Sequence, residues 1–280
     1  RDEGILAAAG QYGVLPCMHL SSLTEEGRFS SSRAETLLKS SHRQEALLEQ
    51  IKEILKEKGY GGVDVDFEYL QPGLAGAYTA FIERLRQELN KLGYTVQVAL
   101  APKVSRGQKG LLYESHDYAA LGRAANGALL MTYEWGYSAG PPMAVAPLDK
   151  VRQVVDYALG EIEAKKLFLG VPVYGYDWPL PYRQGATRGV SVAPQEALDL
   201  ARRQGAEIQF DETAQAPWFR YTAADGREHE VWFEDARSSY AKFRLAAEKG
   251  LQGVGLWNLM RPAVQTYLVL HGGFEIEEVR

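Results

Sequence analysis

The chain has 280 residues, of which 46% are hydrophobic, and its formal net charge is −5 at pH 7. This length and hydrophobic content predict a globular protein with a substantial core and exclude a disordered chain. No basic block is present to neutralise phosphates, and the longest apolar runs are far shorter than the roughly 20 residues of a membrane-spanning helix. We therefore expect neither a nucleic acid nor a membrane as a partner.

Amphipathic helices alternate with short β-rich segments along the chain. Helical patterns cover residues 4–11, 43–58, 76–92, 149–159 and 236–249. Strand-like segments centre on Val14, Val63, Val96, Leu129, Phe168 and Val254. Alternation of this kind predicts parallel βαβ units, in which strands buried on both faces are nearly continuous apolar runs.

The predicted fold class is α/β, a TIM (β/α)8 barrel, although a closed barrel needs about eight strands and we count six. The region before Val14 has a helical pattern, so we expect the first two strands to be absent from this chain; two unrecognised strands or an incomplete barrel are the alternatives. Residues 177–231 interrupt the alternation with a helix near 194–203 and several strand-like runs around a turn at 224–226. We interpret residues 1–280 as one barrel with a small α+β insertion at 177–231, between its last two strands.

Three acidic residues alternate with apolar residues in the segment 62–69. Asp64, Asp66 and Glu68 occupy one face of a predicted strand, and the opposite face carries Val63, Val65 and Phe67. Like charges at this spacing, roughly 6.6 Å between alternate residues, raise one another's pKa. A protonated carboxyl beside an ionised one is what cleavage of a glycosidic bond requires. In a barrel these acids would face the axis, with Glu68 nearest the carboxyl-terminal mouth.

Two other interpretations of the acidic segment stay open. It could be a solvated face of an antiparallel strand, or its carboxylates could hold Mg²⁺ or Ca²⁺. We expect no metal, because the five histidines are scattered and form no ligand pair; only His19 follows a strand-like run, and we interpret all five as surface or structural. Cys17, the single cysteine, is predicted to be an inert core residue. Buried carboxylates are destabilising unless they are functional, which favours catalysis.

The acidic segment resembles the Asp-x-Asp-x-Glu signature of family 18 glycoside hydrolases, the chitinase-like barrels. Residues 131–134 resemble the sixth-strand motif of that family, residues 169–175 the seventh strand, and residues 255–258 the eighth. The segments 131–147, 174–179 and 231–238 are similar to the branch of bacterial spore-germination or cortex-lytic N-acetylglucosaminidases. The resemblance covers essentially the whole chain. It also makes residues 14–20 the third strand of the family fold.

The resemblance implies a role for each matching residue. Glu68 is the general acid, and the substrate's own 2-acetamido oxygen is the nucleophile, so the anomeric configuration is retained. Asp66 orients the acetamido group and stabilises the positive oxazolinium intermediate, while Asp64 holds and tunes Asp66. Tyr133 donates a hydrogen bond to the acetamido carbonyl, and Trp257 stacks on the sugar. For Tyr133 and Trp257, ordinary core packing is the alternative.

Further residues near the predicted mouth are candidates for binding sugar rings. Glu134, where many chitinases have Asp, would contact the substrate. Stacking on sugars is predicted for Tyr69, Trp135, Tyr137, Tyr176 and Trp178, with a purely structural role as the alternative for each. Gly61 stands where the family often has Asp, a difference that leaves the three acids intact.

The resemblance implies a retaining β-glycosidase that acts on N-acetylglucosamine polymers, with spore cortex peptidoglycan favoured over chitin. The expected partner is this polysaccharide, no cofactor is expected, and the sequence does not fix the oligomeric state. Association with the spore or cell wall, or secretion, is implied as the location. The alternatives are a chitinase, a catalytically silent carbohydrate-binding barrel and a metal-dependent hydrolase.

Overall fold

The computed structural model describes residues 2–276, which form two compact units. The first unit contains residues 2–130 and 157–167, and the second contains residues 131–156 and 168–276. Helix α6, Leu148–Leu159, contributes residues to both. No helix among residues 2–276 combines the length and the apolar character that crossing a lipid bilayer demands.

The first unit contains four parallel strands in the order β1-β2-β3-β4. The strands are β1 Cys17–Ser21, β2 Gly62–Asp66, β3 Thr95–Leu100 and β4 Gly127–Leu130. The helices are α1 Glu3–Tyr12, α2 Ser31–Leu38, α3 Ser41–Lys58, α4 Ala75–Asn90 and α5 Tyr118–Ala124, with short 3-10 turns η1 Pro72–Leu74 and η2 Ala164–Lys166. All four predicted strands are confirmed, but β1 begins at Cys17 and leaves Val14 exposed.

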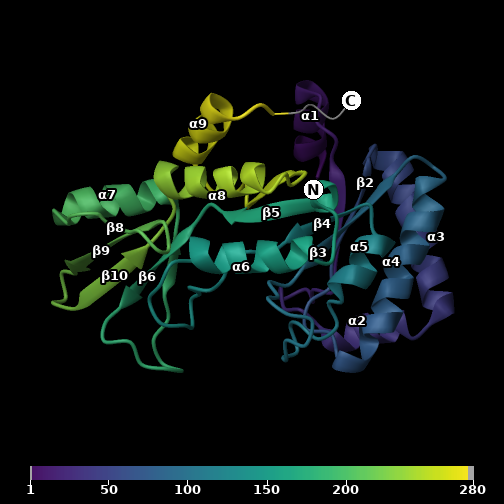
Figure 1. Cartoon of the computed structure of the whole chain (residues 1–280), viewed down its shortest axis with the longest axis horizontal. Helices are drawn as coiled ribbons and strands as arrows, with labels where there is room; N and C mark the ends of the chain where they lie inside the picture. The colour runs from purple at the N-terminus through teal and green to yellow at the C-terminus, as the bar shows by residue number, and fades with distance from the viewer. Residues whose placement is uncertain (1, 277–280) are drawn as a thin grey trace. The chain divides into compact units, whose positions relative to one another are not determined.

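Helix α4 covers the apolar face of β2 (Figure 1). Val63 and Val65 are fully buried, and the Phe67 ring stacks against Tyr78 and Phe81 of α4 at centroid distances of 5.7 and 5.8 Å. Burying an aromatic side chain of this kind contributes roughly 1.5–3 kcal/mol. The alternation in the sequence therefore has its predicted physical basis: the apolar residues face a helix, and the acids face the other side of the sheet.

The second unit contains a parallel pair and an antiparallel sheet. The parallel pair is β5 Leu167–Pro172 with β11 Gly253–Trp257. The antiparallel sheet has the order β7-β6-β10-β9-β8 and consists of β6 Gly175–Pro179, β7 Val190–Val192, β8 Gln209–Asp211, β9 Ala216–Thr222 and β10 Glu228–Trp232. Its further helices are α7 Pro194–Gln204, α8 Ala236–Glu248 and α9 Val264–Gly273. The predicted turn joins β9 to β10, where Gly226 has φ +81°.

One face of the antiparallel sheet is covered by α7. Ala197 and Ala201 of this helix pack with the side chains of Phe219, Val231 and Phe233 in one buried cluster. Small residues on the helix let it approach the large residues of the strands closely. Figure 1 shows α7 lying along this sheet.

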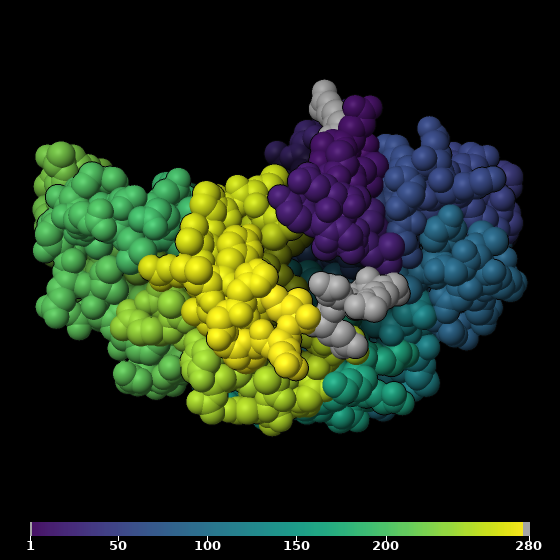
Figure 2. Space-filling model, turned by 90° about the horizontal axis from the view of Figure 1, so that it is seen from above, coloured from purple at the N-terminus to yellow at the C-terminus, as the bar shows by residue number. Residues whose placement is uncertain are grey.

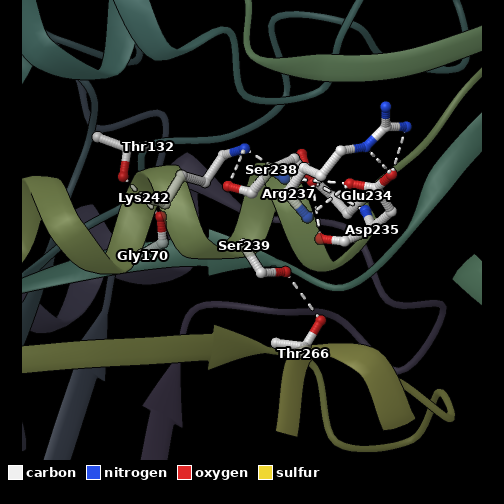
Figure 3. A network of polar contacts seen from close by, with 9 residues as sticks. All are labelled: Thr132, Gly170, Glu234, Asp235, Arg237, Ser238, Ser239, Lys242 and Thr266. Atoms are coloured by element: carbon white, nitrogen blue, oxygen red, sulfur yellow. Dashed lines mark hydrogen bonds and ion pairs between the residues drawn. The ribbon is translucent and has the colours of Figure 1, made fainter. Parts of the chain in front are cut away.

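A buried ion pair joins α8 to the segment before it (Figure 3). Lys242 Nζ lies 2.8 Å from Glu234 Oε2, and both side chains are almost inaccessible to solvent. Asp235 caps the helix, because its Oδ1 accepts hydrogen bonds from the backbone N–H groups of Arg237 and Ser238. Helix α9 lies at the surface of the molecule (Figure 2), and it is attached to α8 by the 3.0 Å hydrogen bond between the hydroxyls of Ser239 and Thr266.

Candidate active site

The acid row, Asp64, Asp66 and Glu68, lies at the carboxyl end of β2. Asp64 and Asp66 belong to the strand, but β2 ends at Asp66. Glu68 is therefore two residues beyond the strand, and the prediction that all three acids share one strand was wrong in this respect. Asp66 is 7% exposed, while Asp64 and Glu68 are partly exposed.

Burial makes Asp66 an unusual carboxyl group. It raises the pKa of Asp66 from 3.8 to about 6, with a smaller upward effect from Asp64 and a downward effect from His19. Its Oδ1 atom is buried and has no hydrogen-bond partner among residues 2–276. A buried polar atom without a partner is destabilising, which indicates that Asp66 is placed here for a reason other than stability.

His19 lies beside the acid row and was missed as a site residue. It is paired with Asp64 in the parallel register of β1 and β2. Its Nδ1 atom lies 2.9 Å from Asp64 Oδ2, and its Nε2 atom lies 3.8 Å from Asp66 Oδ2. The hydrogen bond to Asp64 raises the pKa of His19. The signal in the sequence is the alternation of Cys17, His19 and Ser21 with apolar residues, which places His19 on one face of a strand.

Cys17 itself is exposed, so its predicted place in the core was wrong. The physical reason is its position as the first residue of β1, which stands at the end of the strand order.

The segment that carries Glu68 is held by hydrogen bonds to alternate backbone carbonyls. We call residues 67–71 the acid loop. Its three bonded carbonyl oxygens belong to Phe67, Tyr69 and Gln71. The donors, in the same order, are His116 Nε2 at 3.0 Å, Ser31 Oγ at 2.5 Å and Ser115 Oγ at 2.6 Å. These bonds fix the backbone on both sides of Glu68.

His116 has a defined tautomer in this arrangement. The backbone N–H of Ala101 donates to Nδ1 at 2.9 Å, so the proton is on Nε2 and is donated to the Phe67 carbonyl. Burial lowers the pKa of His116 to about 4, so the ring is neutral at pH 7. The sequence contains no local signal for this contact, because His116 is 49 residues from Phe67.

In the second unit, Glu134 accepts hydrogen bonds from two tyrosines. Tyr174 Oη donates to Glu134 Oε1 at 2.5 Å, and Tyr176 Oη donates to the same atom at 3.0 Å. Desolvation of the carboxyl group raises the pKa of Glu134, and the two hydroxyls oppose that rise. Glu134 has φ +66°, which is rare for a residue with a side chain and orients the carboxylate toward the tyrosines. Tyr174 is a further polar residue that the sequence did not single out.

Tyr133 and Trp257 lie against each other. Their ring centroids are 6.5 Å apart, and their planes differ by 15°. Trp257 is the last residue of β11 and is 45% exposed, so part of its ring is open to solvent. The two residues that the resemblance assigned to the bound sugar are thus neighbours.

The predicted sugar-stacking aromatics differ in accessibility. Tyr69 is 42% exposed, while Trp135 and Tyr176 are partly buried. Trp178 is 0% exposed and lies against Gly189, where a Cβ atom would approach Trp178 Nε1 to 2.7 Å. Its interpretation as a stacking residue is therefore corrected: the ring presents no free face, and it supports Tyr176 at a centroid distance of 5.4 Å.

No group of three or more His, Cys, Asp and Glu side chains within residues 2–276 has an arrangement that could hold a metal ion.

Parallel strands covered by helices, with carboxylates where one strand ends, are the construction of an α/β enzyme. The sequence pattern of the family "Glycosyl hydrolases family 18" matches residues 24–261, and the chain belongs to that family.

Relatives within the family are similar in both sequence and structure. The chain is 45% identical over 252 residues to the cortical fragment-lytic enzyme of Bacillus subtilis (strain 168), which covers 90% of this chain and 58% of that enzyme. The crystal structure of the spore cortex-lytic enzyme SleL from Bacillus megaterium QM B1551 has a TM-score of 0.94 and 41% identity, covering 99% of this chain and 63% of that one. SleL from Bacillus cereus gives a TM-score of 0.95 at 35% identity, covering 98% and 63%. The chain thus spans about three-fifths of the length of these relatives.

Proposed function

We propose that the chain is a retaining glycoside hydrolase that cleaves β-linked N-acetylglucosamine polymers with help from the substrate's own acetamido group. The observation that carries this proposal is the acid row of a family 18 chain, with a buried Asp66 and a Glu68 on an immobilised loop. A proton donor must stay within hydrogen-bond reach of the leaving oxygen, and a loop held at three carbonyls provides that precision.

The acids have separate roles in this proposal. Glu68 protonates the glycosidic oxygen as the bond breaks, and the same residue as a carboxylate then activates water. Asp66 faces the acetamido group and stabilises the positive charge of the oxazolinium ion. Because Asp66 is desolvated, its charge interacts more strongly with that cation than an exposed carboxylate would. Asp64 holds Asp66 in position through the shared face of β2 and through His19.

In this proposal further residues recognise the sugar. Tyr133 donates a hydrogen bond to the acetamido carbonyl, and the partly exposed Trp257 ring stacks on a pyranose face. Glu134 accepts from a sugar hydroxyl, and the two tyrosines orient its carboxylate for that contact. Tyr69, Trp135 and Tyr176 remain candidates for neighbouring sugar rings.

The substrate that we propose is the peptidoglycan of the spore cortex. Support comes from the names of the relatives, which are cortical fragment-lytic and spore cortex-lytic enzymes. The corresponding location is the spore or its wall. We also propose that the fold is a TIM barrel without its first two strands, in which residues 177–231 are an α+β insertion.

Replacing the proposed acid gives the direct test. Glu68→Gln keeps the size of the side chain but cannot donate a proton, so we expect muropeptide release from purified cortex to fall at least 100-fold, because general acid catalysis contributes roughly 10²–10⁴-fold. Mass spectrometry of the released fragments measures this change and identifies the reducing-end sugar. The matched control is Glu57→Gln at an exposed position of α3, which should leave the rate unchanged.

Undiminished release by the Glu68→Gln variant would rule the proposal out. If the intact chain binds cortex glycan but releases no fragment, the chain is instead a carbohydrate-binding barrel. Release from chitin in preference to cortex would replace the proposed substrate with chitin and leave the chemistry unchanged.

A further inference from the structure

We propose that His19 is a positioning residue of the acid row, whose imidazolium holds Asp64 and balances the charge of Asp66. This inference rests on the proposed function, because it concerns how the aspartates are prepared for a cationic intermediate. His19 does not touch the substrate in this role; it acts through the two carboxylates.

The geometry of β1 and β2 brings both ring nitrogens to the acids. His19 and Asp64 are direct neighbours in the parallel register, and Ser21 is paired with Asp66 one step further along. The ring therefore lies beside two carboxylates on one face of the sheet. Nδ1 donates to Asp64 at 2.9 Å, while Nε2 is 3.8 Å from Asp66, too long for a hydrogen bond but close for a charge interaction.

The surroundings make His19 the cation of this cluster. Among residues 2–276, it is the one basic side chain within 4 Å of Asp64 or Asp66. Three uncharged groups flank the two aspartates and His19. Gln97 of β3 is paired with Asp64, Cys17 precedes His19 by two residues on β1, and Tyr78 of α4 interacts electrostatically with Asp66. Burial raises the pKa of Tyr78, while partial desolvation of the thiol and the nearby charge of Asp64 raise the pKa of Cys17, so both groups stay neutral at pH 7. Glu68 follows in the chain, two residues beyond the end of β2.

The imidazolium therefore affects the two aspartates in different ways. The hydrogen bond fixes the Asp64 carboxylate, and the positive charge favours the ionised form of Asp66 despite its burial. An ionised Asp66 is the form that stabilises an oxazolinium cation. Without the imidazolium, Asp66 would retain its proton to higher pH and would be less effective in that role.

The pH dependence of the reaction tests this inference. His19→Gln keeps a hydrogen-bond donor for Asp64 but removes the positive charge. We expect the acidic limb of the kcat/KM profile to move up by about one pH unit, since an opposite charge within 4–6 Å shifts a carboxyl pKa by roughly 1–3 units. The loss of rate should therefore be large at pH 5 and small at pH 8. His42→Gln, at an exposed position of α3, is the control and should keep the wild-type profile.

A loss of rate that is equal at all pH values, or an unchanged profile, would overturn the role of His19. Either result, combined with an inactive Glu68→Gln variant, would leave the proposed function in place. Activity in the Glu68→Gln variant would instead remove the proposed function itself.

A second measurement does not depend on turnover. The His19 ring can be titrated by NMR in the intact chain and in an Asp64→Asn variant. We expect the wild-type midpoint to lie above the ordinary 6.5 and to fall in the variant, because the bond to Asp64 is the main cause of the raised pKa. A wild-type midpoint at or below 6.5 would contradict the inference.

Discussion

At the scale of single residues, the proposed function of the acid row accounts for a destabilising arrangement. Asp66 is buried with one oxygen atom that has no hydrogen-bond partner in the described part of the chain. Burial of this kind makes the carboxyl hold its proton more tightly in the folded state than in the unfolded state. Ionisation of Asp66 is therefore destabilising in the folded protein, and selection for stability alone would remove this carboxyl group.

Asp66→Asn should separate the effect of this carboxyl group on activity from its effect on stability. Folding raises the pKa of Asp66 from 3.8 to about 6. As the pH rises between these two values, ionisation of Asp66 therefore lowers the free energy of unfolding. Removing the charge should stabilise the chain by roughly 2–3 kcal/mol at pH 7 and by almost nothing at pH 3. Urea denaturation at the two pH values measures this difference, and the variant should lack activity. A variant that is less stable than wild type at pH 7 would show that the carboxylate is a stabilising group.

At the scale of elements, contacts between distant segments fix the loops and helix ends. The acid loop is held by donors from the start of α2 and from the segment before α5. In the second unit, the buried pair of Glu234 and Lys242 ties the middle of α8 to the preceding segment (Figure 3). Burial raises the pKa of Glu234, and Lys242 opposes that rise. Each contact requires both partners, because a buried charge or polar group left alone is strongly destabilising.

Lys242→Met tests the buried pair. The substitution leaves Glu234 without its cation, and we expect the free energy of unfolding to fall by about 3–5 kcal/mol. Adding Glu234→Leu should recover much of this loss, since two apolar residues can replace a buried ion pair. The matched control is Lys39→Met, which removes an exposed pair with Glu35 and should change stability by less than about 1 kcal/mol. Equal effects of the two single substitutions would show that the burial of the Lys242 pair has no energetic consequence.

At the scale of the whole molecule, the proposed chemistry depends on protons and side-chain charge. Dialysis against EDTA should therefore leave the rate of cortex digestion unchanged, because the acid, the nucleophile and the charge stabilisation come from the protein and the substrate. A rate assay before and after chelation measures this. Activity that is lost with EDTA and restored by Mg²⁺ or Ca²⁺ would favour the metal-dependent alternative.

Much of the fold could be predicted because its signals are local. The apolar runs around Val63, Val96, Leu129 and Phe168 are strands that are largely buried, as expected for parallel strands covered on both faces. The run around Val254 is also a strand, although its residues are partly exposed. The helices α2, α5 and α9, of seven to ten residues, were not predicted. A short helix carries little periodic signal, although α1, which also has ten residues, was predicted. Strands β6 and β7 were also not predicted. Part of their stability comes from pairing within the antiparallel sheet, which the local sequence does not reveal.

The residues of the candidate site, too, were predicted only in part. The three acids and the pair of Tyr133 and Trp257 were recognised from motifs, while Trp178 was misplaced because an aromatic residue in a motif gives no measure of its burial. His19, His116 and Tyr174 required the structure. Their partners lie 40 to 49 residues away in the chain, so no sequence window contains both members of a contact.

The family, the parallel strands and the alternation of acids and apolar groups along β2 are visible in the amino-acid sequence, because they follow from local periodicity and motif order. The partner of each imidazole, the depth at which Asp66 is buried and the donors to the backbone around Glu68 became known from the folded chain. Hydrogen bonds and pKa values depend on distances of a few ångströms, and these distances are set when remote segments pack together.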